Sequence, residues 1–239
     1  MIKLAISGCQ GRMGRRITEL ALKDKAFKIS TLLESKNRPD VPLLSHNIPV
    51  NFEDAALKGS GVLIEFTAPE ATIEHLKACQ KYGVNMVIGT TGLTKAQITQ
   101  IKKASSKIAI VFSSNMSVGV NLVFGLIRQA AQITGKGYSI ALSETHHVHK
   151  KDAPSGTAKT MAEIAQTHAK AKVVDIASIR EGEVIGDHTI NFESPVDKIS
   201  IAHHAKTRDI FAEGSLVAAK FLSKKKKGLF NMQDVLGLK

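Results

Sequence analysis

A glycine-rich turn directly after the first apolar run is the feature that most constrains how this chain folds. The run Ile2–Ile6 predicts a short buried strand, and the turn Gly8–Gly14 (GCQGRMG) leads from it into a helical pattern. Glycines at such a turn let the backbone approach a pyrophosphate closely, and the N-terminus of the helix offers N–H groups to the anion. Glu34 lies 20 residues beyond Gly14, at the end of the next predicted strand, where a carboxylate can bind a ribose hydroxyl. The pattern predicts a dinucleotide-binding domain, but the spacing is G-x-x-G-x-x-G rather than G-x-G-x-x-G, so a turn of another α/β protein is the alternative.

The first 112 residues alternate short β-branched runs with helical patterns. Further strands are predicted at Phe27–Leu33, Val62–Phe66, Met86–Ile88 and Ile108–Phe112. Parallel strands need a crossover helix to connect them, so this alternation predicts an α/β fold with an open, doubly wound sheet of the Rossmann type. Prolines interrupt residues 37–52, which we expect to form a loop or a short edge element.

The pattern changes after about residue 117. Helices are predicted at 120–131 and 155–169, and strands at Ser139–Ser143, Val173–Arg180, His188–Phe192, Ile199–His203 and Ile210–Ala212. Strands grouped in this way favour a second, α+β domain with a mostly antiparallel sheet. From about Gly214 the chain is again helical and polar.

The composition argues against several classes of protein. The net charge is +12, but the only dense basic run is Lys224–Lys227, and aromatic residues do not interleave with it. This disfavours nucleic-acid binding and fits a solvated loop, with the excess charge steering anionic ligands. No run approaches the ~18 apolar residues of a membrane span, and no secretory signal is visible. With only two cysteines, read as reduced thiols, we expect a cytoplasmic protein that binds no membrane.

Two further strand ends have the character of ligand loops. They are Gly89–Gly92 (GTTG) and Ser113–Met116, and open α/β sheets bind ligands beyond the carboxyl ends of their strands. The form of the nicotinamide cofactor stays open between NADH and NADPH. Glu34 disfavours a 2′-phosphate by its charge, whereas Lys36 and Arg38 lie close enough in sequence to accept one.

The segment Glu144–Ala158 (ETHHVHKKDAPSGTA) is the richest in chemical groups. It follows a predicted strand and leads into a helix, whose start at 155–157 offers backbone N–H groups and hydroxyls to an anion. Lys150 adds a positive charge, and three histidines supply candidates for proton transfer near neutral pH.

Three interpretations of these histidines compete. A metal site is disfavoured because only His147 and His149 would share a face of a strand, and no cysteine or carboxylate pattern completes the ligand set. We therefore expect no metal. The histidines could also be satisfied by local hydrogen bonds. The favoured interpretation is a proton donor beside an anion-binding lysine, which suits reduction of a carboxylate-bearing C=C or C=N compound.

With these motifs the chain resembles the 4-hydroxy-tetrahydrodipicolinate reductase (dihydrodipicolinate reductase) family of the diaminopimelate–lysine pathway. Glu144–Ala158 looks like the family signature E-x-H-H-x-x-K-x-D-x-P-S-G-T-A in full. The other matching segments occur in the family's order along nearly the whole chain: Gly8–Gly14, Glu65–Thr67 with Pro69-Glu70, Gly89–Gly92, Asn115–Asn121, Arg180 to His188, and His203 to Gly214.

The resemblance implies an NAD(P)H-dependent oxidoreductase that reduces 4-hydroxy-tetrahydrodipicolinate, a small dicarboxylate, to tetrahydrodipicolinate. It implies a homotetramer, a dinucleotide-binding domain over 1–116 joined by about 209–239, and a substrate-binding and oligomerisation domain over 117–208. His146 matches the proton donor or acceptor, and Lys150 a proton donor that also contacts the substrate. The substrate carboxylates match His147, Lys150, Gly156 and Thr157. The cofactor contacts match Gly8, Cys9, Gln10, Gly11, Arg12, Met13, Glu34, Gly89, Thr90, Thr91, Ser113, Ser114, Asn115, Met116, Arg208 and Phe211.

Three other functions compete with this one. A different two-domain nicotinamide enzyme would share the fold but would not need the whole Glu144–Ala158 segment. A non-catalytic dinucleotide sensor would keep the glycine turn and Glu34 but would not need His146 and Lys150 together. Binding of nucleic acid through the basic charge is the third.

Overall fold

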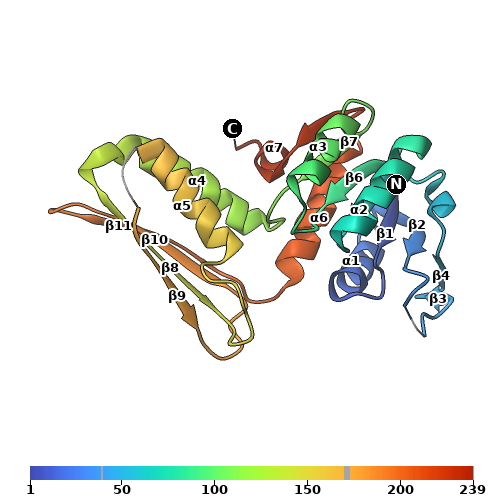
Figure 1. Cartoon of the computed structure of the whole chain (residues 1–239), viewed down its shortest axis with the longest axis horizontal. Helices are drawn as coiled ribbons and strands as arrows, with labels where there is room; N and C mark the ends of the chain where they lie inside the picture. Colours follow the sequence, from blue (N-terminus) through green and yellow to red (C-terminus); the bar gives the residue numbers. More distant parts are fainter. Residues whose placement is uncertain (39, 170–172, 239) are drawn as a thin grey trace. The chain divides into compact units, whose positions relative to one another are not determined.

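The computed structural model describes residues 1–38, 40–169 and 173–238, which form two compact units (Figure 1). Unit 1 consists of Met1–Met116 and Phe211–Val235, and unit 2 consists of Ser117–Ile210 with the last residues from Leu236. One residue of the predicted 37–52 loop, at position 39, lies outside the described residues.

Within the described residues, unit 1 is built on an eight-stranded sheet of order β12-β7-β6-β5-β1-β2-β4-β3. All neighbours pair in parallel except β3 and β4, which form an antiparallel edge. The strands are β1 (Ile2–Ser7), β2 (Phe27–Leu33), β3 (Leu44–Ser45), β4 (Ile48–Asn51), β5 (Val62–Glu65), β6 (Asn85–Ile88), β7 (Ala109–Phe112) and β12 (Gly228–Phe230). The predicted doubly wound α/β sheet is confirmed.

Helices cover both faces of this sheet. They are α1 (Arg12–Lys23), α2 (Pro69–Tyr82), α3 (Lys95–Ala104), α6 (Asp209–Leu222), the short α7 (Met232–Leu236) and the 3-10 helix η1 (Asp54–Leu57). The chain runs from β1 to β2 on one side and from β5 through β6 to β7 on the other, so right-handed crossovers put α1 and the α2–α3 pair on opposite faces. On the α2–α3 face, Leu76, Cys79 and Ile101 pack against strand residues such as Met86 and Ile88.

The order of the strands reverses between β1 and β5. β1 leads to β2 in one direction, whereas β5, on the other side of β1, leads to β6 and β7 in the opposite direction. Such a reversal opens a crevice at the carboxyl ends of the two strands, and it is where open α/β sheets bind their ligands. The glycine turn after β1 lies at this place.

The C-terminal part of unit 1 differs from the sequence prediction. The residues predicted as a strand at Ile210–Ala212 form the first turn of α6, because Leu216, Ala219 and Leu222 continue their apolar pattern at helical spacing. Beyond the exposed run Lys224–Lys227, the chain adds β12 to the edge of the sheet beside β7, a strand that the sequence did not predict.

One asparagine side chain ties this C-terminal segment to the sheet. Asn85 donates from Nδ2 to the carbonyls of Leu222 and Lys225, both at 3.0 Å, and accepts at Oδ1 from the backbone N–H of Ala109 at 2.9 Å. The end of α6, the start of β6 and the start of β7 are therefore held by one residue.

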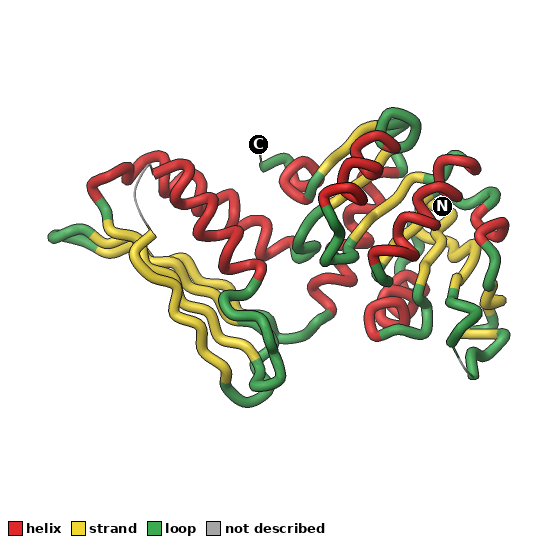
Figure 2. Tube along the Cα trace, viewed as in Figure 1, coloured by secondary structure: helices red, strands yellow, loops and turns green. Residues whose placement is uncertain are grey.

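In the described part of unit 2, a four-stranded sheet of order β11-β10-β8-β9 is covered on one face by two helices (Figures 1 and 2). Two of its three strand pairs are antiparallel, and β8 pairs with β9 in parallel, so the predicted mostly antiparallel sheet is confirmed. The elements are α4 (Val118–Thr134), η2 (Gly135–Gly137), β8 (Ser139–His146), α5 (Gly156–Ala169), β9 (Val173–Arg180), β10 (Asp187–Glu193) and β11 (Lys198–His204). The core of the unit lies between the helices and strands and includes Phe124, Ile127, Met161, Ile190 and Phe192.

Candidate active site

The inward face of β8 carries the chemistry of unit 2. Side chains alternate along a strand, and Ile140, Leu142, Glu144 and His146 are all buried on the same face. The first two pack in the core, and the last two bring a carboxylate and an imidazole to the end of the strand. A period-two pattern that begins apolar and ends Glu-x-His thus places an acid–base pair at the edge of a hydrophobic core.

Strand pairing brings two more groups to this place. In register, Glu144 lies opposite His188 of β10, and His146 lies beside Arg180 of β9. The guanidinium of Arg180 donates to both oxygens of Glu144, at 2.9 and 3.1 Å. The backbone N–H of Ser155 donates to the same carboxylate at 3.3 Å, and Nδ1 of His146 makes a very short hydrogen bond to it.

Burial and the neighbouring charges set the protonation of Glu144 and His146. Burial alone would raise the pKa of Glu144, but the hydrogen bonds from Arg180 and His146 outweigh it, and the pKa is lowered. The pKa of His146 is also lowered, first because the ring is buried and then because Lys150 and Arg180 are positive, although Glu144 opposes both effects. His146 is therefore a neutral imidazole at neutral pH, oriented by a carboxylate that is already shared with an arginine.

The second nitrogen of His146 faces a space that only glycine leaves open. A Cβ built on Gly186 would lie 3.0 Å from Nε2 of His146 and 3.7 Å from Cε1 of His188. Because Nδ1 is taken by Glu144, Nε2 is the atom that can exchange a proton with a ligand. A side chain at position 186 would crowd it.

His188 links this group to the start of α5. Its ring meets that of His146 edge-on at 5.1 Å between centroids, and its Nε2 lies 3.0 Å from the hydroxyl of Ser155. The same hydroxyl accepts from the N–H of Ala158 at 3.1 Å and so caps the helix. Burial, with the nearby charge of His146, lowers the pKa of His188 to about 4. His188 is thus a neutral support for the site.

The predicted substrate residues surround this centre. Lys150 lies in the loop after β8, partly buried, with its Nζ 2.7 Å from a carboxylate oxygen of Asp152. Arg180 also donates to the carbonyl of Asp152 at 2.5 Å, so the loop is tied to the Glu144 pair. Gly156 begins α5, and a Cβ there would meet nothing within 4 Å. Thr157 follows it, and His147 lies half-buried directly after β8.

The metal interpretation takes a different form in the structure. His147 and His149 do not share a strand face, because β8 ends at His146 and both lie in or beside the following turn, with ring centroids 6.2 Å apart. Among the described residues, the group with the spacing of metal ligands is instead Glu144, His146 and His188, whose ligand atoms lie within 4.8 Å of one another. Arg180 already supplies the positive charge that this carboxylate needs.

In unit 1 the glycine turn has the geometry of a dinucleotide site. Gly8 has a φ of +59°, and a Cβ on Gly14 would lie 2.1 Å from the carbonyl oxygen of Gly8, so glycine is required at both positions. Helix α1 starts at Arg12 without a side-chain cap on Gly11 and without an acidic residue in its first turn. Its N–H groups and positive dipole end therefore suit an anion such as pyrophosphate. Met13 lies half-buried in that first turn.

Glu34 closes the turn from the end of β2. Its carboxylate accepts from the N–H of Gln10 at 2.9 Å and from the N–H of Ser35 at 3.0 Å. Arg38 donates to the carbonyl of Gln10 at 3.2 Å and lies 3.7 Å from Glu34, and Lys36 is ion-paired with Glu53. Both basic candidates for a 2′-phosphate thus already have acidic partners.

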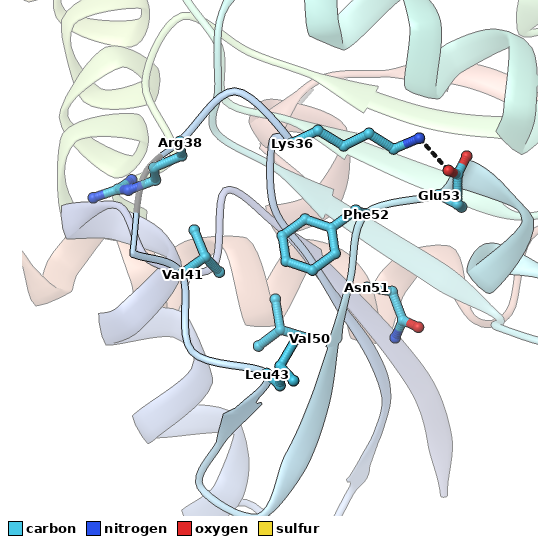
Figure 3. Close-up of a pocket in the computed structure, with 8 residues that line it drawn as sticks. All are labelled: Lys36, Arg38, Val41, Leu43, Val50, Asn51, Phe52 and Glu53. Atoms are coloured by element: carbon cyan, nitrogen blue, oxygen red, sulfur yellow. Dashed lines mark hydrogen bonds and ion pairs between the residues drawn. The ribbon is translucent and has the colours of Figure 1, made fainter.

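Two neighbouring pockets share Lys36, Phe52 and Glu53 in their linings. One, of about 570 Å³, is lined by Gly8, Glu34, Thr67, Ala68 and His75 among others. The other, of about 610 Å³, is shown in Figure 3 and lies between the strand and loop residues Lys36, Arg38, Val41, Leu43, Val50, Asn51, Phe52 and Glu53.

Several predicted cofactor residues have side chains that face inward. Cys9 is buried, and burial together with the charge of Glu34 raises the pKa of its thiol to about 11. Gly89 packs under the ring of Phe66, which a Cβ would approach to 2.2 Å, and Thr90 and Met116 are buried. Residues of this kind can meet a cofactor only through their backbone. The more accessible predicted residues are Thr91, Ser113, Ser114, Asn115, Arg208 and Phe211.

The glycine-turn sheet and the acid–base group of unit 2 together define a two-domain, nicotinamide-dependent oxidoreductase. The sequence profiles of the two halves of dihydrodipicolinate reductase match the chain, the N-terminal one over residues 2–116 and the C-terminal one over residues 119–236. The chain belongs to the dihydrodipicolinate reductase family and is an NAD(P)H-dependent oxidoreductase. The predicted family and enzyme class are confirmed.

Curated relatives and solved structures agree with this family. The 4-hydroxy-tetrahydrodipicolinate reductases of Nitrosomonas eutropha and Laribacter hongkongensis are 42% and 40% identical, and each match covers 100% of this chain and 99% of the relative. The dipicolinate-bound dihydrodipicolinate reductase from Paenisporosarcina sp. TG-14 has the same fold, with a TM-score of 0.86, 23% identity and 98% of both chains covered. An aspartate dehydrogenase from Thermotoga maritima is similar at a TM-score of 0.55 and 12% identity, over 94% of this chain and 98% of that one.

Proposed function

We propose that this protein reduces 4-hydroxy-tetrahydrodipicolinate to tetrahydrodipicolinate with NADH or NADPH. The observation that carries the proposal is the group at the end of β8, where Glu144 and Arg180 hold a neutral His146 beside Lys150 and the open start of α5. A proton donor next to two kinds of anion-binding group suits a dicarboxylate that must gain a hydride and a proton together.

The cofactor, when bound, supplies the hydride, and the chain's own residues do the rest. Lys150 and the N–H groups at Gly156 and Thr157 bind the substrate carboxylates, with His147 beside them. The two negative charges of the substrate raise the pKa of His146, so its Nε2 gains a proton as the substrate binds and can deliver it when the hydride arrives. Glu144 stabilises the imidazolium through Nδ1.

In unit 1, the turn from Gly8 to Met13 binds the pyrophosphate, and Glu34 binds the adenosine ribose. The adenosine end would be held in the 570 Å³ pocket, which carries the carboxylates of Glu34, Glu53, Asp54 and Glu74. A 2′-phosphate would meet this negative charge, so we expect NADH to be used more efficiently than NADPH.

The test is oxidation of NADH and of NADPH by the purified protein, with and without freshly condensed pyruvate and aspartate semialdehyde. We expect oxidation only with the condensed product. His146→Gln and Lys150→Gln should each lower kcat on the order of 10² to 10⁴. His149→Gln and Lys151→Gln are matched controls, because both residues are exposed neighbours in the same loop, and they should leave kcat unchanged.

The other outcomes separate the competing functions. Cofactor binding without oxidation would favour a dinucleotide sensor, and oxidation with a different substrate would favour another dehydrogenase. Wild-type turnover in both His146→Gln and Lys150→Gln would overturn the assigned roles.

The family resemblance leads us to propose also that the protein is a cytoplasmic homotetramer assembled through unit 2. The sheet face of unit 2 away from α4 and α5 exposes Ala141 and Ile179, which would lie in such an interface. None of the described helices is both long and apolar enough to span a membrane. Light scattering of the purified protein measures the oligomeric state, and a monomer would refute the assembly.

A further inference from the structure

A buried glutamate lies at the reversal point of the sheet in unit 1. Glu65 is the last residue of β5, and none of its surface is exposed to solvent. Because β5 pairs directly with β1, its carboxyl end faces the crevice beside the glycine turn. The assigned roles of the turn and of Glu34 do not use this carboxylate.

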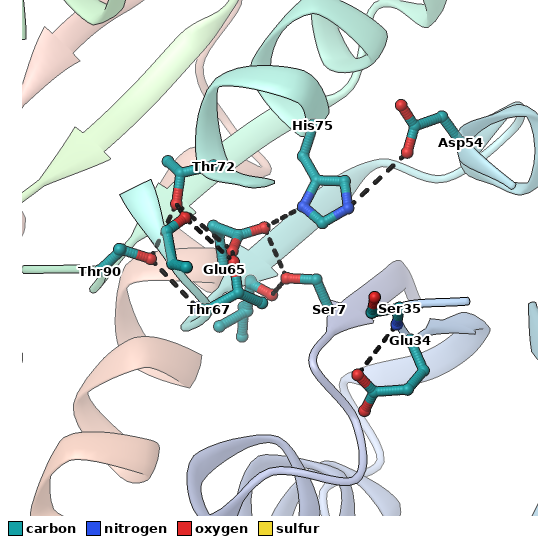
Figure 4. Close-up of polar contacts among 11 residues, drawn as sticks. Ser7, Glu34, Ser35, Asp54, Glu65, Thr67, Thr72, His75 and Thr90 are labelled. Atoms are coloured by element: carbon teal, nitrogen blue, oxygen red, sulfur yellow. Dashed lines mark hydrogen bonds and ion pairs between the residues drawn. The ribbon is translucent and has the colours of Figure 1, made fainter. Parts of the chain in front are cut away.

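The Glu65 carboxylate accepts hydrogen bonds on both oxygens (Figure 4). Ser7 donates from its hydroxyl to Oε2 at 2.6 Å, and Nδ1 of His75 lies 2.6 Å from the same oxygen. The hydroxyl of Thr67 makes a very short hydrogen bond to Oε1, with Thr72 at 3.5 Å. Such a set satisfies a buried carboxylate that would otherwise be costly.

Through these partners the network reaches the ends of three strands. Ser7 directly precedes Gly8 of the glycine turn, and the methyl of Thr67 lies 2.9 Å from where a Cβ on Gly8 would be. Thr72 extends the network, because its hydroxyl is hydrogen-bonded at 2.9 Å to the hydroxyl of Thr90 in the loop after β6. Thr90 in turn accepts from the N–H of Thr67 at 3.2 Å. One carboxylate therefore holds the ends of β1, β5 and β6 together.

His75 is the cation that balances this carboxylate. Its Nε2 lies 3.7 Å from the carboxylate of Asp54 in η1, so the ring bridges a fully buried acid and a half-exposed one. Burial alone would lower the pKa of His75, but the hydrogen bond to Glu65 and the charges of Glu65, Asp54 and Glu74 outweigh it, and the pKa is raised. His75 also lines the 570 Å³ pocket together with Gly8 and Glu34.

We propose that Glu65 and His75 are a positioning pair for the dinucleotide site, whose opposite charges hold the three strand ends in the arrangement that binds the cofactor. This inference rests on the proposed function, because it takes the glycine turn as the cofactor site. Neither residue touches the reacting atoms.

The pair makes cofactor affinity depend on pH. When His75 loses its proton, Glu65 is left as a buried negative charge without a cation, and the loops that enclose it must open to hydrate it. The positioning is therefore complete at low pH and is lost as the pH rises through the raised pKa of His75. The carboxylates that face His75 are Glu65 from β5, Asp54 from η1 and Glu74 from α2.

The test measures the Kd of NADH by its fluorescence, without substrate, between pH 6.5 and 9. We expect the wild-type Kd to weaken about tenfold across this range, a change of about 1.4 kcal/mol in the binding free energy. His75→Gln should bind at every pH as weakly as the wild type at pH 9. Glu65→Gln/His75→Gln, which removes both charges, should restore much of the affinity and show no pH dependence. His46→Gln changes an exposed histidine of the same unit and should behave like the wild type.

Two readouts separate positioning from simple charge attraction. The effect of His75→Gln on Kd should persist at 0.5 M salt, where interactions between exposed charges are screened. Amide hydrogen exchange in His75→Gln should be faster at residues 7–11, 66–68 and 90–92 than in the wild type at the same pH.

The outcomes distinguish this inference from the function beneath it. A wild-type Kd that does not change with pH, or a double variant no better than His75→Gln, would overturn the positioning role and leave the reductase function intact. Failure of the wild type to bind either NADH or NADPH at any pH would overturn both.

Discussion

In each unit a buried glutamate is hydrogen-bonded to a histidine, yet the pKa values of the two histidines are shifted in opposite directions. In unit 1 the pKa of His75 is raised, because the hydrogen bond to Glu65 and the charges of Glu65, Asp54 and Glu74 together outweigh the burial of the ring. In unit 2 the pKa of His146 is lowered, because the ring is buried and Arg180 already shares the charge of Glu144. A buried acid therefore does not by itself fix the protonation of its histidine. Burial of the ring and a third, charged group decide it together, and that group is Asp54 for His75 and Arg180 for His146.

The protonation of each histidine also fits its proposed role, which is positioning for His75 and proton transfer for His146. A histidine with a raised pKa keeps its charge, and so its ion pair, to higher pH and can hold loops together. A histidine that is neutral at rest is free to take up a proton when an anionic ligand arrives, and can then give it away. The two pairs are therefore alike in chemistry but suited to structure in one unit and to proton transfer in the other.

The largest effect is expected from removing Arg180, the charged group that distinguishes the Glu144–His146 pair from the Glu65–His75 pair. Arg180→Gln leaves Glu144 with His146 as its cation, so the pKa of His146 should rise and the descending limb of the kcat/KM pH profile should move to higher pH. Loss of one partner of a buried ion pair typically costs about 3–5 kcal/mol, which urea unfolding would measure. Arg16→Gln, which removes an exposed pair with Glu19, should cost less than about 1 kcal/mol. An unmoved pH profile in Arg180→Gln would contradict the role given to Arg180.

The two units should also respond to pH in opposite directions. His188 has a pKa lowered from 6.5 to about 4, so the unfolded chain binds its proton first, and this stability is lost as the pH falls from about 6.5 to 4. The shift corresponds to about 3 kcal/mol. His75 gives the opposite sign, with stability lost as the pH rises.

Urea unfolding of His188→Gln should therefore lose less stability than the wild type between pH 7 and 4. His168→Gln, at a less buried histidine of α5, is the control. Identical pH slopes for the wild type and His188→Gln would show that His188 is not the group responsible.

A smaller effect is expected from crowding the free nitrogen of His146. Gly186→Ala places a methyl group 3.0 Å from Nε2, which displaces the ring by tenths of an ångström. We expect kcat to fall about tenfold, with the KM for the cofactor unchanged. Gly137→Ala, where a Cβ would meet nothing within 4 Å, should keep full activity. Unchanged kcat in Gly186→Ala would mean that this side of the ring is not used.

The smallest effect should come from the outer acid of the unit 1 pair. Asp54 is 44% exposed and lies 3.7 Å from His75, so Asp54→Asn should cost less than about 1 kcal/mol and lower the pKa of His75 slightly. In a His75→Gln background the same change should cost nothing, which a double-mutant cycle in urea would show. An equal cost in both backgrounds would mean that Asp54 does not act through His75.

The sequence predicted the elements whose signal is local. The predicted strand Phe27–Leu33 coincides with β2, and the helix 155–169 differs from α5 by one residue, because periodicity and capping are readable within each segment. The strand predicted at Ile210–Ala212 was wrong because a three-residue apolar run does not distinguish a strand from the first turn of a helix. β12 was missed because Gly228–Phe230 becomes a strand only by pairing with β7.

The candidate site was predictable in the same partial way. His146 and Lys150 stand out because they share one segment with an anion-binding helix start. The hydrogen bonds from Arg180 to Glu144 depend on the register between β8 and β9, and the two residues are 36 positions apart in the sequence. A local sequence pattern does not show which residues of two distant strands lie side by side. Likewise, Glu65 and His75 meet only because a strand end and a helix pack together.

The return of the chain to unit 1 has a consequence for synthesis on the ribosome. Residues 1–116 emerge before unit 2, but the edge of β7 stays without its neighbour until Gly228–Phe230 leave the exit tunnel. Asn85 likewise has no partner in the carbonyls of Leu222 and Lys225 until those residues are made. An open strand edge is a site for unwanted pairing with other chains. Almost all of unit 2 is translated before unit 1 can close, so the nascent chain completes its later domain first and its earlier domain last.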